Sequence, residues 1–427
     1  MEITSNGTYD VTNFVNACVN VQVESTFNIE FGDVAPTDTN KLWIKTDTPE
    51  ELKITSSPNF NQVVQSATTL PMKIAKVASA AVGEKVYLFG GSTNPNQGTT
   101  ASASINIFDT TNRAVTTLST ELPVAATEIS AAAVGNKIYL FGGEYDYESY
   151  LNTINVFDIE TSTITTLSVK LPKAATAMSA ITVGTKIYLF GGLHIGIDDY
   201  GREDTIPLDT INVFDTTTNT ITTLSTKLPK ASYRIASTAI DNKIYLFGGY
   251  RYNDTTGYPV MESINTISVF NTEANTITTL STKLPYEGMY AMSAEAIGTK
   301  VYLFGGVGDG PVKEIRVFDT ETNSITLLNA KLPNIVSSLA SEVIGTRVYL
   351  FGGNSYGTPL DIICIFGEDI KALASNIILI DASPSTNLFN LTPNIEISIN
   401  AVYLGNANGE AEKVAAALYV DRVWTEI

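Results

Sequence analysis

Histidine and cysteine are almost absent from this sequence of 427 residues, which contains one histidine and two cysteines. A single histidine excludes a Ser-His-Asp triad and any metal site built from several histidines. We expect His194, in the acidic stretch GLHIGIDDYGREDT, to be a solvated loop residue. Cys18 and Cys364 lack the spacing of a metal site, and each is predicted to be a small buried side chain.

Basic clusters are missing too, since 26 Lys and Arg residues stand against 44 Asp and Glu, a formal net charge of −18. A nucleic-acid partner is excluded, because binding a phosphate backbone needs clustered cations. An anionic membrane surface is disfavoured for the same reason. No apolar run reaches the length of a membrane span, and the opening MEITSNGTYDV lacks the pattern of a signal peptide.

The sequence does contain a repeat with a period close to 50 residues, which is typical of a propeller. The string YLFGG occurs six times, with its first glycine at Gly90, Gly142, Gly191, Gly248, Gly305 and Gly352. Each unit is predicted to form four strands. They are a small apolar run such as SAAAV, a KIYLF strand after a tight turn, an INVFD strand, and a Thr-rich ITTLS strand that ends in Leu-Pro.

A count of the Leu-Pro pairs predicts how the ring closes. One fourth strand, from Val63 to Leu70, precedes the first YLFGG, and the last unit, near residues 337 to 368, has no fourth strand of its own. Six units therefore complete six blades only if these two parts pair. That pairing also removes the open sheet edges of a linear array.

From about Leu42 to Phe366 these residues resemble the Kelch family, whose hallmark is the Gly-Gly that ends the second strand. The resemblance implies an all-β fold, a six-bladed Kelch-type β-propeller closed by an N-terminal strand, which we place at residues 35–369. Kelch fourth strands usually carry a tryptophan, so packing between blades must use smaller side chains here. The residues at that position are Val115, Ile164, Ile221, Ile277 and Ile325.

The two ends, residues 1–34 and 370–427, are predicted to be small β-rich segments. ITSNGTYDVTN, APTDTNKLWIKT and YLGNANGEAEKVAAALYVDRVWTEI resemble segments of tail and other virion proteins of bacteriophages and prophages of Gram-positive bacteria. The resemblance implies a virion component, made in the host cytoplasm and present in several copies per particle. Its ends would attach to other virion or tail proteins and its propeller would be presented.

Candidate ligand-binding residues fall in the variable loops between second and third strands. Tyrosine offers an apolar face and a hydrogen-bonding tip, which suits a saccharide ring or a protein surface, although tyrosine also simply suits β-rich surfaces. These candidates are Tyr145, Tyr147, Tyr150, Tyr200, Arg202, Tyr250 and Tyr252. A second set, Lys76, Glu128 and Arg234, is predicted to face the mouth of the central channel, either as a polar pocket or as mutually neutralising charges.

We expect no catalytic residue, no cofactor and no metal site, since the acids at Asp198, Asp199, Glu203 and Asp204 match no established Ca²⁺ loop. Three functions remain open. The leading one is a tail- or baseplate-associated protein that binds a host-surface glycan or protein. The others are a structural decoration or linking protein, and a sugar-processing propeller like the sialate mutarotases, which Lys76, Glu128 and Arg234 would serve. Near-identical blades favour a scaffold over an enzyme.

Overall fold

A computed structural model of the chain divides it into two compact units, residues 61–366 and residues 1–60 with 367–427. It describes residues 7–10, 18–23, 27–30, 51–56, 60, 63–94, 100–197, 203–253, 260–286, 288–367, 397–405, 411–420 and 423–426. Side chains are described only between residues 60 and 367 of these ranges, those of 203, 253 and 260 excepted. Within this part of the chain, no helix is long and apolar enough to cross a membrane.

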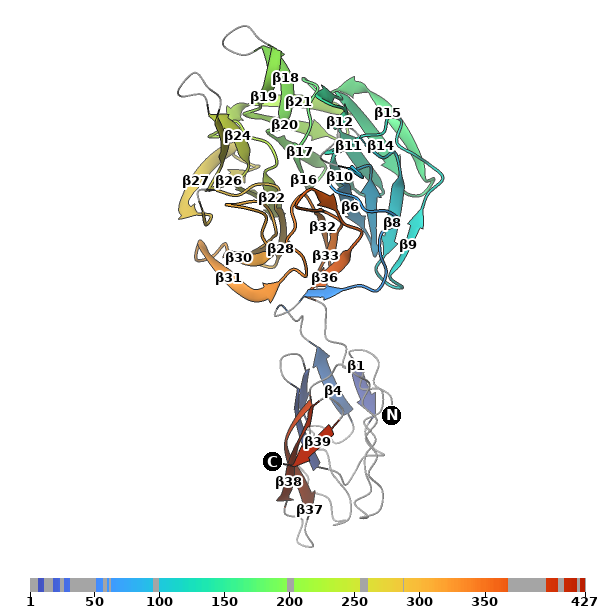
Figure 1. Ribbon diagram of the computed structural model, residues 1–427, viewed down its shortest axis with the longest axis vertical. Helices are drawn as coiled ribbons and strands as arrows, with labels where there is room; N and C mark the ends of the chain where they lie inside the picture. Colours follow the sequence, from blue (N-terminus) through green and yellow to red (C-terminus); the bar gives the residue numbers. More distant parts are fainter. Residues whose placement is uncertain are drawn as a thin grey trace. The chain divides into compact units, whose positions relative to one another are not determined.

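Residues 61–366 form the propeller, in which six four-stranded antiparallel sheets surround a central channel (Figure 1). Blade 1 consists of β6 (Ala78–Val82), β7 (Lys85–Phe89), β8 (Ile105–Asp109) and β9 (Ala114–Thr117). Blade 2 consists of β10 (Ser130–Val134), β11 (Lys137–Phe141), β14 (Thr153–Asp158) and β15 (Thr163–Lys170). Blade 3 consists of β16 (Ser179–Val183), β17 (Lys186–Phe190), β20 (Thr210–Asp215) and β21 (Thr220–Lys227).

The remaining three blades repeat this order. Blade 4 consists of β22 (Ala236–Ile240), β23 (Lys243–Phe247), β26 (Thr266–Asn271) and β27 (Thr276–Lys283). Blade 5 consists of β28 (Ser293–Ile297), β29 (Lys300–Phe304), β30 (Glu314–Asp319) and β31 (Ser324–Lys331). Blade 6 consists of β32 (Ala340–Ile344), β33 (Arg347–Phe351), β36 (Ile363–Phe366) and β5 (Val63–Gln65).

Blade 6 confirms the predicted closure of the ring. Its outer strand β5 comes from the start of the propeller and pairs antiparallel with β36, with Val63 opposite Phe366 and Gln65 opposite Cys364. Beyond the strand, the amide of Leu70 donates to the carbonyl of Asp361 at 2.8 Å. The first and last segments of the propeller therefore share one sheet, and β5 covers the edge that β36 would otherwise expose.

An aromatic cluster joins each blade to its neighbour. The phenylalanine of every third strand lies against the tyrosine and phenylalanine of the preceding YLFGG string; Phe157, for example, lies 5.8 Å from Tyr87 and 5.6 Å from Phe89 between ring centroids. Phe108 of blade 1 makes the same contacts across the closure, to Tyr349 and Phe351 of blade 6. The six phenylalanines are fully buried: Phe108, Phe157, Phe214, Phe270, Phe318 and Phe366. Tilted and edge-on ring pairs of this kind stabilise each blade interface beyond area burial.

The β-branched residues in place of tryptophan pack at these same interfaces, as predicted. Ile164, Ile221, Ile277 and Ile325 are half-buried against the interblade clusters, and Val115 packs on the cluster between blades 6 and 1.

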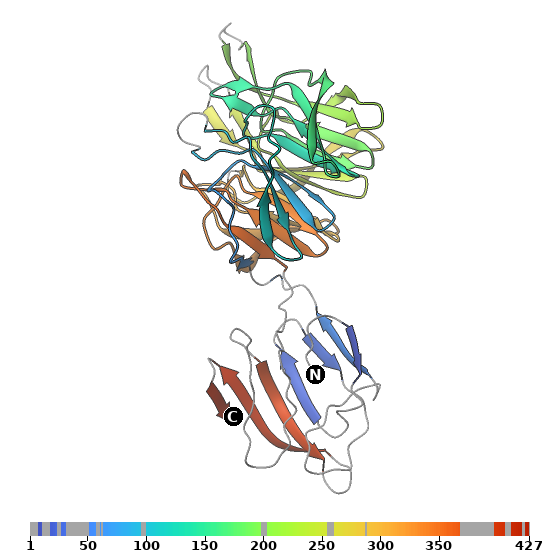
Figure 2. The ribbon, with the colours of Figure 1, turned by 90° about the vertical axis from the view of Figure 1, so that its right-hand side faces the viewer.

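Residues 1–60 and 367–427 form the terminal unit, which holds one seven-stranded sheet (Figure 2). Its strands are ordered β1 (Gly7–Asp10), β4 (Glu51–Ser56), β3 (Phe27–Glu30), β2 (Cys18–Val23), β37 (Ile397–Gly405), β38 (Ala411–Val420) and β39 (Val423–Glu426). The two ends of the chain meet where β2 pairs with β37. The predicted boundary at residue 35 lies instead at Asn61, because β4 pairs with β1 and β3 and so belongs to this unit.

Candidate functional site

The channel mouth is encircled by one residue from each blade, at the position seven residues before the hairpin turn. These residues are Lys76, Glu128, Ala177, Arg234, Ala291 and Ser338, and all have left-handed backbone with φ between 52° and 58°. The amide of each donates to the carbonyl of its counterpart in the neighbouring blade at 2.9–3.3 Å, and the amide of Lys76 closes the circle onto Ser338. A continuous ring of backbone hydrogen bonds thus fixes the direction of six side chains. It also accounts for a conformation that residues other than glycine seldom adopt.

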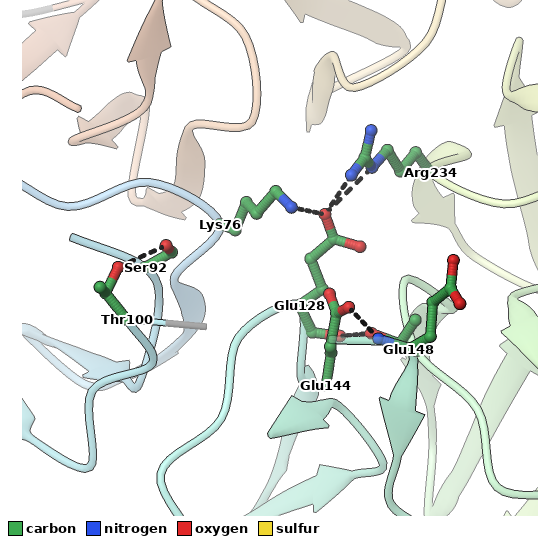
Figure 3. Close-up of polar contacts among 8 residues, drawn as sticks. Lys76, Ser92, Thr100, Glu128, Glu144, Glu148 and Arg234 are labelled. Atoms are coloured by element: carbon green, nitrogen blue, oxygen red, sulfur yellow. Dashed lines mark hydrogen bonds and ion pairs between the residues drawn. The ribbon is translucent and has the colours of Figure 1, made fainter. Parts of the chain in front are cut away.

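Three of these side chains meet across the mouth, as Figure 3 shows. Lys76 Nζ lies 2.9 Å from Glu128 Oε1, and Arg234 donates to the same oxygen through Nε at 3.1 Å and through Nη2. The Glu128 side chain is only 9% exposed. Burial alone would raise the pKa of Glu128, but Arg234 and Lys76 together outweigh it and hold that pKa at about 2.

A cavity of about 180 Å³ lies at this mouth, lined by the six ring residues and by the residue after each. Arg234 and Lys76 retain N–H groups beyond those that Glu128 accepts, because an arginine carries five and a lysine three. Ala177, Ala291 and Ser338 are small, which leaves room in the rest of the cavity. The arrangement can hold a small polar group by hydrogen bonds.

Three β-ribbons stand beside the mouth, where the sequence had predicted only variable loops. They are β12 (Glu144–Asp146) with β13 (Ser149–Tyr150), β18 (Leu193–Ile197) with β19 (Glu203–Pro207), and β24 (Tyr250–Asn253) with β25 (Val260–Ser263). The first residue of each ribbon forms an antiparallel β-bridge with the residue that precedes a mouth residue in the chain. These bridges join Glu144 to Thr127, Leu193 to Thr176, and Tyr250 to Tyr233. Neighbouring ribbons contact one another through β13 and β18 and through β19 and β24. Among the described residues, blades 2, 3 and 4 thus carry a wall of contacting ribbons. Blade 6 has only the short pair β34 (Asn354–Ser355) and β35 (Thr358–Pro359), and the described parts of blades 1 and 5 form no such two-stranded sheet.

Tyrosines gather at the blade-4 end of this wall. Tyr250 stacks on Tyr290 with centroids 4.1 Å apart and an interplanar angle of 13°. Tyr233 lies edge-on to Tyr250 at 5.7 Å and beside Tyr252 at 6.5 Å, and the Arg234 guanidinium lies over the Tyr233 ring. Burial raises the pKa of Tyr250 above its ordinary value. The structure therefore brings two predicted residues, Tyr250 and Tyr252, next to the charged mouth, together with Tyr233 and Tyr290.

The blade-2 ribbon carries the other predicted tyrosines. Tyr147 is 68% exposed at its tip and Tyr145 is exposed beside it, whereas Tyr150 is half-buried near Glu144. Burial and then the nearby Glu128 raise the pKa of Glu144, whose Oε1 accepts from the amide of Glu148 at 3.2 Å (Figure 3). Tyr200 and Arg202, also predicted site residues, lie outside the described residues, as do Asp198 and Asp199.

The prediction for His194 was wrong. This residue is 7% exposed on β18, opposite Ile206 of β19, because the segment forms a ribbon and not a loop. Its Nδ1 donates to the carbonyl of Ile195 at 2.8 Å, and its Nε2 accepts from Lys173 Nζ at 3.1 Å. Burial lowers the pKa of His194. A neutral histidine with both nitrogens occupied has a structural role.

Sequence reasoning missed two carboxylates inside the channel. Glu295 on β28 and Glu342 on β32 line a cavity of about 400 Å³ below the mouth. Burial and then repulsion from Glu342 raise the pKa of Glu295 to about 8, and burial raises that of Glu342 to about 7. The signal was available in the sequence: at the same strand position the other blades have Ala80, Ala132, Ile181 and Thr238.

Comparison with known proteins agrees with this architecture. Residues 76–237 and 234–372 match a family described as the KLHDC2/KLHL20/DRC7 Kelch-repeats domain. No curated protein sequence matches the chain. The matched segments span most of the propeller, and a Kelch propeller is consistent with a binding or scaffold role. The chain belongs to the KLHDC2/KLHL20/DRC7 Kelch-repeats domain family.

Proposed function

We propose that this protein is a non-enzymatic binding component of a bacteriophage or prophage particle, associated with the tail or baseplate. In this proposal its propeller recognises a glycan or protein on the host surface. The terminal unit attaches it, in several copies, to other virion proteins. The virion part of the proposal is supported by the resemblance of the terminal sequences to phage tail proteins.

The observation that carries the binding role is the one-sided wall of ribbons beside the mouth. Blades that serve only as packing material have no need for three contacting ribbons on blades 2, 3 and 4. The wall sets exposed Tyr147, half-buried Tyr252 and the charged mouth on one rigid frame. Aromatic faces stack on sugar rings or on apolar protein surface, while the Lys76 and Arg234 donors offer hydrogen bonds to ligand oxygens.

The charged mouth gives less support to a sugar-processing enzyme. Lys76 and Arg234 both contact one oxygen of Glu128, whose pKa of about 2 suits neither a general acid nor a general base near neutral pH. A mutarotation assay on sialic acid tests this alternative directly. We expect no acceleration over the buffer rate.

The binding role is tested with Tyr147→Ala and Tyr252→Ala in the full chain. Each loses a face that contributes on the order of 1 kcal/mol, so binding to host cells and to array glycans should weaken about fivefold per substitution. Tyr356→Ala is the matched control, because Tyr356 is 72% exposed on blade 6, away from the wall. Incorporation into particles should be unchanged in all three variants.

A structural decoration protein is the second candidate, favoured by the repetition of one Thr-rich outer strand in β15, β21 and β27. In that case the wall variants would bind host cells as wild type does. A cryo-electron microscopy map of the particle would then show the propeller covered by neighbouring proteins.

A further inference from the structure

The channel below the mouth contains two carboxyl groups that no basic side chain among the described residues accompanies. Its wall is formed by the first strands β6, β10, β16, β22, β28 and β32, whose residues there are mostly Ala and Ser. Glu295 and Glu342 from adjacent blades are the two ionisable side chains among the described residues that line it, and no Lys, Arg or His accompanies them. Buried carboxylates without a counter-charge are costly, so something must neutralise the pair.

Hydrogen bonds in the channel favour the ionised form of both carboxylates. Ser341 Oγ donates to Glu295 Oε1 at 2.6 Å. Ser79 Oγ donates to Glu342 Oε1 at 2.8 Å, and the amide of Ala81 donates to Glu342 Oε2 at 3.1 Å. A carboxylate has about four lone-pair sites, so three donors leave several sites on the pair for a further ligand.

A third polar side chain that lines this cavity, Ser293, lacks a hydrogen-bond partner in the described part of the chain. Ser293 is 9% exposed, and its hydroxyl has no hydrogen-bond partner among the described residues. Ser293 lies two residues before Glu295 on β28, so both side chains leave the same face of that strand. It also lines the same cavity as the two carboxylates. A buried hydroxyl left unpaired needs an explanation, and a ligand bound in this cavity would provide one.

We propose that the channel binds one divalent cation, of the Ca²⁺ class, between Glu295 and Glu342, with Ser293 as a further oxygen ligand. With both carboxyl groups ionised, the pair carries a charge of −2, which one such ion balances. The available ligands are all oxygens, as hard cations require. The described residues hold no group of three or more His, Cys, Asp or Glu side chains placed for a metal, so bound water completes the coordination shell.

The size of the channel suits Ca²⁺ better than Mg²⁺. A cavity of about 400 Å³ leaves space for several waters, and Ca²⁺ accepts irregular shells of six to eight oxygens, whereas Mg²⁺ demands a near-ideal octahedron. Ile129, Met178 and Ile235 line both this cavity and the mouth cavity, so the two adjoin. This site is independent of host recognition and differs from the acidic stretch near Asp204, the one Ca²⁺ candidate in the sequence.

The test uses the full chain stripped with EDTA and then titrated with CaCl₂ or MgCl₂ at pH 7.5. We expect calorimetry to give one bound Ca²⁺ per chain, and Ca²⁺ to raise the melting temperature by several degrees, with a smaller effect of Mg²⁺. Glu295→Gln and Glu342→Gln should each abolish the shift, and Ser293→Ala should reduce it. Asp204→Asn, the matched control in the acidic stretch, should keep it.

Two results would overturn the proposal. If wild type shows no Ca²⁺ shift and the glutamine variants are the more stable proteins in EDTA, protons and not a cation neutralise the pair. If Asp204→Asn loses the shift while Glu295→Gln keeps it, the acidic stretch is the site. The glutamine variants keep size and shape, and their melting in EDTA shows directly that they fold.

Discussion

Replacing Glu128 with glutamine should destabilise the propeller by an amount that follows from its pKa. The pKa falls from the ordinary 4.5 to about 2, and this difference already contains both the burial penalty and the attraction of Arg234 and Lys76. A pKa difference of one corresponds to about 1.4 kcal/mol, so ionised Glu128 contributes about 3 kcal/mol to the free energy of unfolding at neutral pH. Glu128→Gln loses this contribution and leaves two cations facing each other at the mouth.

The measurement is urea unfolding of wild type and Glu128→Gln, with Glu121→Gln as an exposed control that should change stability by less than about 0.5 kcal/mol. At pH 7 the variant should lose about 3 kcal/mol, a fall in melting temperature of about 5 °C for a domain of this size. A loss below about 1 kcal/mol would show that the three side chains do not interact as described.

The pH dependence gives a second readout of the same interaction. Because the folded pKa is depressed, the contribution of Glu128 is complete above the unfolded value of 4.5 and is lost as the pH falls from 4.5 to about 2. The difference in unfolding free energy between wild type and Glu128→Gln should therefore shrink over that window. A difference that stayed constant down to pH 2 would refute the reasoning.

Two further predictions concern backbone and closure. Gly191→Ala should destabilise the protein by at least about 3 kcal/mol, because the φ of Gly191 is +62° and an added Cβ would lie 2.1 Å from the Ser232 carbonyl oxygen. Gly184→Ala should destabilise it by only about 1 kcal/mol, because Gly184 has a similar φ of +64° but nothing lies within 4 Å of an added Cβ. Equal melting temperatures for the two variants would contradict this. Gln65→Cys should form a disulfide with Cys364, its cross-strand partner in a non-hydrogen-bonded pair, and the oxidised protein should gain about 3 kcal/mol over the reduced one in urea. Because Cys18 is also present, three free thiols after oxidation, in place of one, would mean that β5 does not close the ring.

The propeller was predictable because the repeat fixes both the strand order and the missing strand. The chain has six Gly-Gly endings and six Leu-Pro pairs, but the first Leu-Pro pair precedes the first Gly-Gly and none follows the last. Only one pairing of strands then completes six four-stranded sheets. The domain boundary was not predictable in this way. The segment ELKITS alternates polar and apolar residues, as strands of either unit could. Only its pairing with β1 and β3 assigns it to the terminal unit.

The positions of the mouth residues could be predicted from the sequence, but the ion pairs between their side chains could not. Because six blades superpose, counting back from each hairpin turn identifies the residues around the channel. Which charges meet depends on a gap in the ring: Ala177 stands between Glu128 and Arg234 in the circle of backbone bonds, and its methyl group lets Arg234 reach across. A larger side chain at residue 177 would separate the pair.

The ribbon wall and the channel carboxylates share one reason for escaping prediction. Both depend on contacts between blades, whereas the sequence repeat describes what the blades have in common and not which blades are neighbours. His194 was misassigned because β18 and β19 pair across a segment whose composition alone favours a loop. Only two of the six inner strands carry an acid at this position, Glu295 and Glu342, and their consequence depends on those two blades being neighbours. Burial raises the pKa of both acids, so protons compete with any cation for them. Two acids side by side in a channel without a base create a demand for positive charge, so in this fold departures from the repeat carry more information about binding than the repeat itself.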